Sequence, residues 1–288
     1  MTVLARTLSM LPLAVLYCLA RPVYFVVYRV LRVRRRVVES NLARAFPQRS
    51  SADVQALGRR VYRNYADVLM EMLHSLRMDE AVLRSRIKFV GDDLLEIELK
   101  QGRPVLLTLA HQCNLEWMLL AACLRFDYPV EVVYRPLSDP GLEAVTTRAY
   151  TRFGGSLIDD RSVIKSIMKR RKVPRIVTLV SDQAPNIKDE IYWTRFLNQE
   201  TGFFLAPEII ARFTDYPVYF AGMRRRSRGY YTVEFKKIAE PPYKGRERSV
   251  IDAYVRAVEQ QILDTPEDWL WMHRRWKRQR SIYEKTDA

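Results

Sequence analysis

The chain of 288 residues carries 48 lysines and arginines against 33 aspartates and glutamates, a formal net charge of +15, and 48% of its residues are hydrophobic. This composition excludes a disordered protein, and the length suits one large domain or one domain with an accessory segment. The positive excess predicts a polyanionic partner: a nucleic acid, an anionic membrane, or an acidic substrate or protein. The three cysteines form no C-x-x-C pair, which argues against a zinc ribbon or a disulfide framework.

The first predicted element is an apolar segment over residues 8–31, which is interrupted by Arg21 and Arg29. Its uninterrupted apolar part, residues 8–20, is shorter than the roughly 20 residues that a spanning helix needs. The larger cluster of positive charge follows this segment, which is atypical of a secretory signal and favours retention on the cytoplasmic side. We therefore predict a membrane anchor, spanning or interfacial, over residues 1–31. The alternative is a buried core helix followed by a solvated basic face.

Residues 37–101 are predicted to form a helical lead-in. Ser50 followed by Asp53 is typical of a helix N-terminus, and apolar residues then recur at three- and four-residue steps. A shorter helix over residues 92–101 is expected to end at Gly102.

From residue 104 onward, short apolar runs alternate with helical patterns. Strands are predicted at 105–110, 130–134, 175–180, 218–223 and 230–235, and helices at 114–125, 139–153, 161–171, 204–214, 247–263 and 266–276. Such alternation is typical of an α/β fold. We expect a mostly parallel central sheet flanked by helices over residues 104–288. This α/β core belongs to one domain over residues 32–288, behind the N-terminal anchor.

Ligands of such sheets bind beyond the carboxyl ends of the strands, so the loop after the first predicted strand is a candidate site. It contains His111, then Asn114 as a helix N-cap, then Glu116 in the first helical turn. A carboxylate beside a histidine can fix its tautomer and raise its basicity, so that the imidazole deprotonates a hydroxyl. On the spacing alone, a structural histidine is the alternative.

Several segments resemble a known family. They are the apolar N-terminus, RRRVVESNLARAFPQRS (34–50), NYADVLMEML (64–73), AHQCNLEW (110–117), VVYRPL (132–137), SDQAP (181–185), ETGFFLAP (200–207) and WLWMHRRWK (269–277). Each alone is unspecific, but the ordered set resembles the late, lauroyl/myristoyl acyltransferases of bacterial lipid A biosynthesis. These belong to the lysophospholipid and glycerolipid acyltransferase superfamily. This chain departs from the family's usual Gly-His-x-x-Asn-Trp-Glu pattern: Ala110 replaces the glycine, Cys113 replaces a small residue, and Leu115 replaces the tryptophan, which here follows the acid as Trp117.

The resemblance implies acyl transfer from an acyl carrier protein to a hydroxyl of a lipid A precursor. His111 would be the general base and Glu116 the carboxylate that orients it, as in the family's His-x4-Asp/Glu box. Cys113 is expected to pack rather than to act as a nucleophile. Arg135 would hold a phosphate or developing negative charge, and a solvated surface arginine is the alternative.

Further substrate-binding candidates follow from the resemblance. Asp182 and Gln183 end a predicted strand at the same sheet edge and are expected to bind Arg135 or substrate, with a turn-forming aspartate as the alternative. Arg161 lies in a segment similar to the superfamily's second box and is a candidate phosphate ligand.

Thr201 and Gly202 resemble the family's Thr-Gly element near the acceptor pocket, with a plain helix-entry turn as the alternative. Three basic runs, at 169–172, 224–228 and 274–280, are expected to face the acidic carrier protein, the phosphorylated acceptor or the anionic inner-membrane surface. The tryptophans at 269, 271 and 276 are expected to form an interfacial belt.

No metal and no tightly bound organic cofactor is implied, since the acyl carrier thioester is a substrate. The expected location is the bacterial inner membrane, with the catalytic domain facing the cytoplasm. A nucleic-acid partner is disfavoured because no helix-turn-helix, zinc or RNP-like signature accompanies the charge. Two alternatives stay open: acylation of another lipid, such as a lysophospholipid or an amino-acid lipid, and a non-catalytic basic membrane protein.

Overall fold

The computed structural model describes residues 7–136, 139–186, 189–245, 248–277 and 280, so the predicted anchor's first six residues and residue 247 lie outside it. In chain order the elements are α2 (Leu13–Phe25), the π-helix η1 (Val26–Val30), α3 (Arg35–Ala45), α4 (Ser51–Ser75), α5 (Glu80–Arg86), β1 (Ile87–Val90), α6 (Asp93–Lys100), β2 (Val105–Leu109), α7 (Leu115–Arg125), β3 (Val130–Tyr134), α8 (Pro140–Thr151), β4 (Ser156–Asp159), the 3₁₀ turn η2 (Asp160–Ser162), α9 (Val163–Lys169), β5 (Ile176–Val180), β6 (Ile191–Phe196), β7 (Gln199–Phe204), α10 (Ala206–Thr214), β8 (Val218–Ser227), β9 (Tyr230–Ala239), α11 (Ser249–Asp264) and the 3₁₀ turn η3 (Pro266–Asp268).

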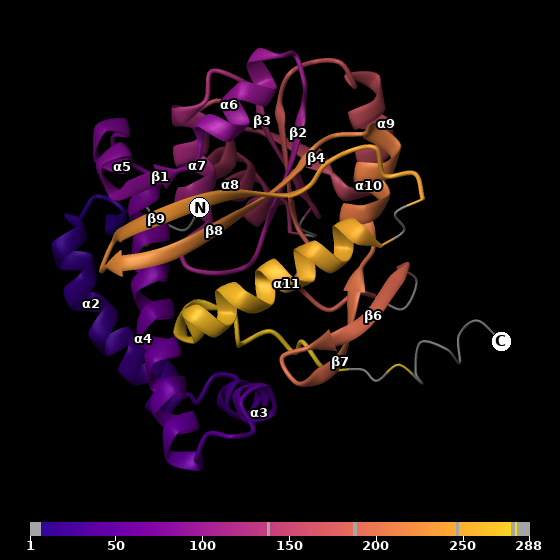
Figure 1. Cartoon of the computed structure of the whole chain (residues 1–288). Coiled ribbons are helices and arrows are strands. Elements are labelled where there is room, and N and C mark those ends of the chain that lie inside the picture. The colour runs from indigo at the N-terminus through magenta and orange to yellow at the C-terminus, as the bar shows by residue number, and fades with distance from the viewer. Residues whose placement is uncertain (1–6, 137–138, 187–188, 246–247, 278–279, 281–288) are drawn as a thin grey trace.

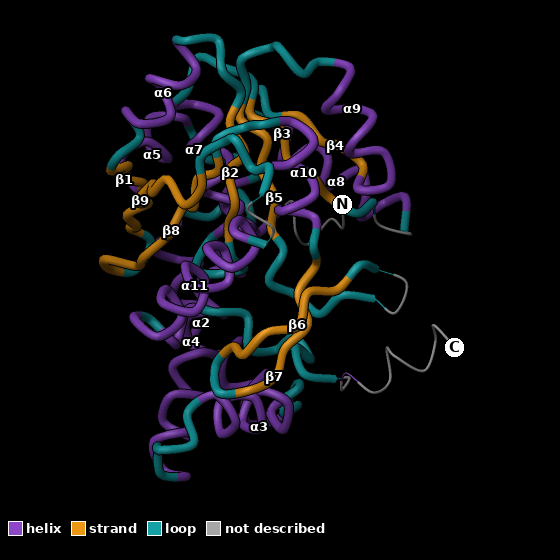
Figure 2. The backbone as a smooth tube through the Cα atoms, turned by 45° about the vertical axis from the view of Figure 1, so that its right-hand side comes forward, coloured by secondary structure: helices purple, strands orange, loops and turns teal. Residues whose placement is uncertain are grey.

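The central sheet confirms the predicted α/β fold. Its seven strands run in the order β1-β9-β8-β2-β5-β3-β4, and every neighbouring pair is parallel except β8–β9. Strand β2 is buried along its whole length, as expected for an apolar run with structure on both faces of the sheet. The five predicted strands are present, whereas β1, β4 and the separate β6–β7 hairpin were not predicted. Figure 2 shows that hairpin standing apart from the main sheet.

Helix starts and stops follow the predicted signals. The Ser50 hydroxyl accepts a hydrogen bond from the backbone N–H of Asp53, and the Asn114 side chain accepts one from Trp117. Gly102 has a φ of +77°, the left-handed conformation that ends helix α6.

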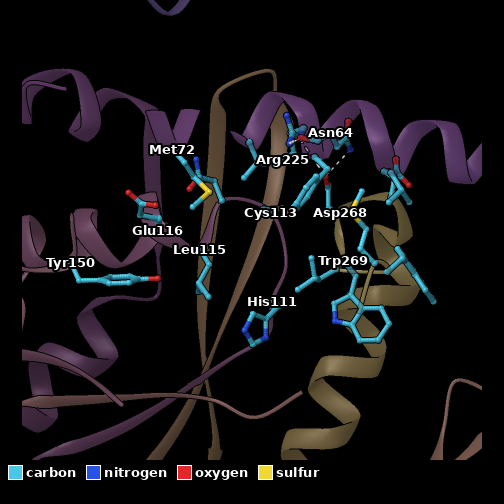
Figure 3. A pocket seen from close by; sticks show the side chains of 18 residues that line it. Asn64, Met72, His111, Cys113, Leu115, Glu116, Tyr150, Arg225, Asp268 and Trp269 are labelled. Carbon is cyan, nitrogen blue, oxygen red and sulfur yellow. Dashed lines mark hydrogen bonds and ion pairs between the residues drawn. The ribbon is translucent and has the colours of Figure 1, made fainter. Parts of the chain in front are cut away.

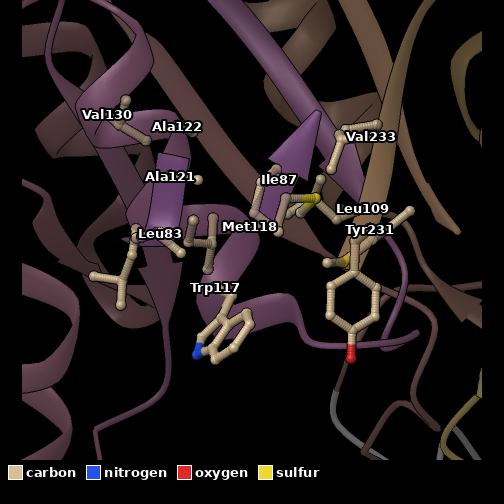
Figure 4. Close-up of a cluster of buried hydrophobic side chains, with 14 of the residues drawn as sticks. Leu83, Ile87, Leu109, Trp117, Met118, Ala121, Ala122, Val130, Tyr231 and Val233 are labelled. Carbon is tan, nitrogen blue, oxygen red and sulfur yellow. The ribbon is translucent and has the colours of Figure 1, made fainter. Parts of the chain in front are cut away.

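The main core lies between the sheet and helices α4 and α7. Trp117 on α7 meets Tyr231 on β9 edge to face, with ring centroids 6.3 Å apart (Figure 4). Leu109, the last residue of β2, is fully buried in the same cluster. This packing fixes the end of the strand from which the candidate site extends.

The predicted helix over residues 266–276 is wrong. Only η3 is helical there, and the chain then runs irregularly, with Trp269 forming a β-bridge to Gln112. The expected interfacial belt is also wrong, since Trp269 and Trp271 are buried in the protein core and the indole N–H of Trp276 donates to Thr201. Burial of these rings against the domain outweighs the helical pattern of the segment.

The apolar N-terminal helix α2 packs lengthwise on α4, and the two lie side by side in Figure 1. Leu13 and Leu16 face inward and are buried, whereas Val15, Leu19 and Phe25 leave an apolar outer face exposed. By length and composition, the continuous helix Leu13–Val30 could cross a membrane. The exposed apolar face is what a membrane-associated helix presents to lipid.

A buried ion pair lies at the end of the sheet away from the candidate site. Glu131 on β3 and Arg175 just before β5 are both fully buried, with Arg175 Nη1 3.4 Å from Glu131 Oε2. Replacing Glu131 by Gln leaves the arginine buried without its countercharge, so we expect the free energy of unfolding to fall by about 3–5 kcal/mol. Urea unfolding in detergent measures this loss. The matched double variant Glu131→Leu/Arg175→Met should be far less destabilised, and a loss under about 1 kcal/mol in the single variant contradicts the prediction.

Candidate active site

The candidate site forms where β2 and β5 end side by side. These strands are parallel neighbours, and their register pairs Leu109 with Val180. Two residues further along each strand come His111 and Asp182, which therefore reach the same level at the carboxyl edge of the sheet. Strand pairing thus brings together two residues that are 71 positions apart in the chain.

Asp182 holds His111 through two contacts. The Nδ1 atom of His111 lies 2.5 Å from Asp182 Oδ1, and the backbone N–H of His111 donates to Asp182 Oδ2 at 2.9 Å. The indole N–H of Trp269 donates to the same Oδ2 at 2.7 Å. The Asp182 side chain is 1% exposed and that of His111 is 28% exposed, so the carboxylate is sealed in while the ring still reaches the site.

This pairing sets the charge of both groups. Burial alone would raise the pKa of Asp182, but the imidazole of His111 and the hydrogen bonds from Trp269 and the backbone hold that pKa below its ordinary value. Burial alone would lower the pKa of His111, but the Asp182 carboxylate raises it above its ordinary value. The ring is therefore a stronger base than a free histidine.

The second ring nitrogen of His111 faces Gln183. The Nε2 atoms of the two side chains are 3.2 Å apart. With the Nδ1 proton directed to Asp182, Nε2 is the unprotonated nitrogen and accepts from the Gln183 amide. A substrate hydroxyl that replaces the Gln183 amide would donate its hydrogen bond to Nε2, the basic nitrogen of His111.

Glu116 does not contact His111, which corrects the expectation that it orients the ring. Its Oε1 accepts the Ser75 hydroxyl at 2.6 Å, and burial raises the pKa of Glu116 despite that hydrogen bond. Figure 3 shows Leu115 between the two side chains. The reason is local, since Glu116 lies in the first turn of α7 and is directed at the end of α4. Both residues still line one cavity.

Arg135 and Arg161 have different surroundings. Arg135 follows β3, lines a cavity beside His111, and donates from Nε to Asp160 Oδ2 at 2.6 Å with 60% of its side chain exposed. Arg161 has 76% of its side chain exposed and forms a bidentate ion pair with Asp159. It lines neither cavity that contains His111. The structure therefore brings Arg135 to the site and leaves Arg161 outside it. The expected contact of Asp182 and Gln183 with Arg135 is replaced by their contacts with His111.

Thr201 and Gly202 lie outside the cavities, in strand β7 rather than in a helix-entry turn. The Trp276 N–H donates to Thr201 Oγ1 at 2.8 Å, and the Gly202 carbonyl accepts from Arg275 Nη2 at 2.6 Å. A Cβ at Gly202 would lie 2.7 Å from Ile191 Cγ2, so the close approach of β6 requires glycine. These residues fasten the C-terminal segment rather than line the site.

Two cavities meet at His111, Leu115 and Tyr150. The first, of about 230 Å³, has a mostly apolar wall built by α4, the His111 loop and residues 267–272. The second, of about 450 Å³, opens beyond the ends of β3 and β5 and includes Arg135. An imidazole base thus stands between an apolar cavity and a cavity with an arginine at its rim.

A buried polar network supports this loop and was missed from the sequence. Glu71 on α4 is fully buried and accepts hydrogen bonds from Asn114 at 2.8 Å, Tyr231 at 2.6 Å and Tyr17 of α2 at 2.8 Å. Burial raises its pKa, and the charge of Arg225 opposes that effect. The only signal in the sequence is a glutamate among the apolar residues of a helix. For Trp269 the sequence predicts a membrane role, whereas its indole N–H donates to Asp182.

Comparisons with known proteins identify the family of the chain. A family model described as bacterial lipid A biosynthesis acyltransferase matches residues 1–278. The chain is 24% identical to the lipid A biosynthesis lauroyltransferase of Escherichia coli K12, over 93% of this chain and 87% of that protein. It is also 24% identical to the lipid A biosynthesis palmitoleoyltransferase of the same organism, over 86% of this chain and 80% of that protein. The chain therefore belongs to the bacterial lipid A biosynthesis acyltransferase family.

Proposed function

We propose that this acyltransferase moves a fatty acyl chain from an acyl carrier protein to a hydroxyl of a lipid A precursor. The observation that carries the proposal is the position of His111, whose unprotonated ring nitrogen, Nε2, lies where the apolar cavity meets the cavity that includes Arg135. An acyl chain suits the apolar cavity, and an arginine suits a phosphorylated acceptor.

The reaction is a single displacement with His111 as general base. Nε2 takes the proton of the acceptor hydroxyl while the hydroxyl oxygen attacks the thioester carbonyl carbon. This addition gives a tetrahedral oxyanion. The carbon–sulfur bond then breaks, the sulfur leaves with the electron pair, and the imidazolium returns the proton to it. Asp182 stabilises the imidazolium between these two steps, as the carboxylate of a triad does. This chemistry requires no metal and no bound organic cofactor.

The remaining site residues have supporting roles. The Gln183 amide donates to Nε2 of His111 and orients the ring until the acceptor hydroxyl displaces that amide. Arg135 binds a phosphate of the acceptor. Glu116 stays a candidate catalytic residue because it shares the apolar cavity with His111, but its role is separate from orienting the ring.

The enzyme is proposed to work at the cytoplasmic face of the bacterial inner membrane. The exposed apolar side of α2 supports membrane association. The arginines that follow it favour the cytoplasmic side. An acidic carrier protein would approach from that side and be attracted by the net positive charge.

Acyl transfer with defined acceptors tests the function. Purified full-length protein is incubated with carrier-protein thioesters of several chain lengths and a tetra-acyl lipid A precursor, a lysophospholipid or an amino-acid lipid. The expected product is the lipid A precursor with one more acyl chain, detected by mass. Product formed only from another lipid would reassign the acceptor, and no product from any acceptor with folded protein would contradict acyl transfer.

A further inference from the structure

A hollow lined by arginines lies where the apolar N-terminal helix ends. It has a volume of about 800 Å³ and is lined by Arg32, Arg34, Arg35, Arg36, Val37, Glu39 and Arg274. We call it the arginine hollow. Five arginines against one glutamate leave a formal excess of four positive charges in one concavity. Guanidinium groups this close together repel one another, and a bound anion offsets that repulsion.

One of these arginines is already neutralised. Arg35 makes an ion pair with Glu39, with Nε and Oε1 2.8 Å apart, and its guanidinium lies 4.7 Å from the ring centroid of Tyr28. The single acidic group of the hollow is therefore used by Arg35. The positive charge of the other arginines is left without a carboxylate from the lining.

The other arginines keep hydrogen-bond donors to spare. Arg34 gives one N–H to the carbonyl of Met272 at 3.1 Å. For Arg32, Arg36 and Arg274, the part of the chain that the structure describes provides no hydrogen-bond or ion-pair partner, and all three are exposed. Guanidinium forks of this kind match the oxygen geometry of a phosphate.

The backbone of the hollow is held in an uncommon conformation. Arg32 and Arg34 have φ values of 49° and 51°, the left-handed region that non-glycine residues rarely adopt. The turn is fixed by the Tyr62 hydroxyl, which donates to the Val33 carbonyl, and by a 3.0 Å hydrogen bond from Val33 N–H to the Val27 carbonyl. Backbone held in this region occurs at binding sites as well as in turns and at helix ends.

The hollow continues directly from the apolar face of the N-terminal helix. Val26, Val30 and Leu31 are exposed, and Arg32 follows immediately. When such an apolar face is immersed at the boundary of acyl chains and headgroups, the residue next to it lies at the level of the lipid phosphates. This continuity favours a membrane lipid over a soluble phosphate as the occupant.

We propose that the arginine hollow binds the phosphate headgroup of an anionic phospholipid. The proposal rests on the proposed function only in placing the enzyme at a membrane. Through Arg34, the hollow also contacts Met272, a wall residue of the apolar cavity beside His111. A bound headgroup would therefore hold the active-site entrance at the membrane surface.

Vesicle binding of the full-length protein tests this without turnover, so a failure of acyl transfer would leave the result interpretable. The probes are phosphatidylcholine vesicles that contain phosphatidylglycerol, or a sulfonate lipid at the same surface charge. The triple variant Arg32→Gln/Arg36→Gln/Arg274→Gln is compared with a control that removes the same charge, Lys169→Gln/Arg171→Gln/Lys172→Gln. The control residues are exposed and follow or end α9, far from α2 and α3 in Figure 1.

The hollow variant should lose roughly 100-fold in its partition onto phosphatidylglycerol vesicles, and the control less than about 3-fold. Wild type should prefer the phosphate lipid over the sulfonate lipid, and the hollow variant should lose that preference. Equal losses in both variants would show diffuse charge attraction and overturn the proposal, as would unchanged binding of the hollow variant. Saturable binding of inorganic phosphate with the affinity seen for vesicles would overturn the lipid as the source.

Discussion

Replacement of His111 by Ala is expected to lower kcat/KM for acyl transfer by about 10³-fold or more, because it removes the base that takes the acceptor proton. The fold should survive, since the side chain lies at the sheet edge with 28% of its area exposed. Initial rates of lipid acylation measure the loss.

Rescue of activity by added imidazole distinguishes a catalytic role of His111 from a structural one. The two cavities that meet at His111 leave room for a small base once the ring is removed. Imidazole should restore part of the activity of His111→Ala and leave wild type unaffected. The matched control is His273→Gln. In wild type the Ala184 N–H donates to His273 at 3.0 Å, and glutamine keeps an acceptor for it. The activity of this variant should stay within about 10-fold of wild type. Activity of His111→Ala near the wild-type value would contradict the assignment.

Replacement of Asp182 by Asn is expected to lower kcat by about 10³–10⁴-fold. The amide removes the negative charge that stabilises the imidazolium, and its N–H group favours the tautomer with the wrong nitrogen protonated. Single-turnover kinetics with saturating acceptor separate this loss from weaker binding.

The matched control keeps the carboxylate and removes one of its partners. Trp269→Phe deletes the N–H that donates to Asp182 but retains a large buried ring, so a loss of about 10-fold is expected. If both variants lost activity equally, the charge of Asp182 would be unimportant and its role would be only to hold the loop.

The sequence predicts those parts of the fold in which local pattern and burial agree. Residues 105–109 are an apolar run that the sheet buries, residues 130–134 are mostly apolar and partly buried, and both segments are strands. Strands β1 and β4 have four residues each, too few for a periodic signal. The helix expected over 266–276 fails because its tryptophans are drawn into the core by contacts from distant segments, such as Phe196 against Trp269.

The sequence predicts His111 and Asp182 at the site but not the contact between them, and it does not reveal the supporting residues Glu71 and Trp269. A histidine after the first core strand and an aspartate after a later one were both recognised as lying at the same sheet edge. His111 meets Asp182 because β2 and β5 are adjacent strands in the matching register. This strand order cannot be read from a single sequence. The direction of Glu116 depends on the packing of α7 against α4, and the anchoring role of Thr201 depends on a C-terminal residue, Trp276.

The pH dependence of kcat/KM tests the His111–Asp182 pair most directly. The base works when neutral, so activity falls as pH drops through the pKa of His111, which Asp182 raises above its ordinary value of about 6.5. In Asp182→Asn only burial remains, which favours the neutral ring, so the acidic limb should move to lower pH. Glu116→Gln should leave the limb where it is in wild type. A limb that moves with Glu116→Gln and not with Asp182→Asn would contradict this account.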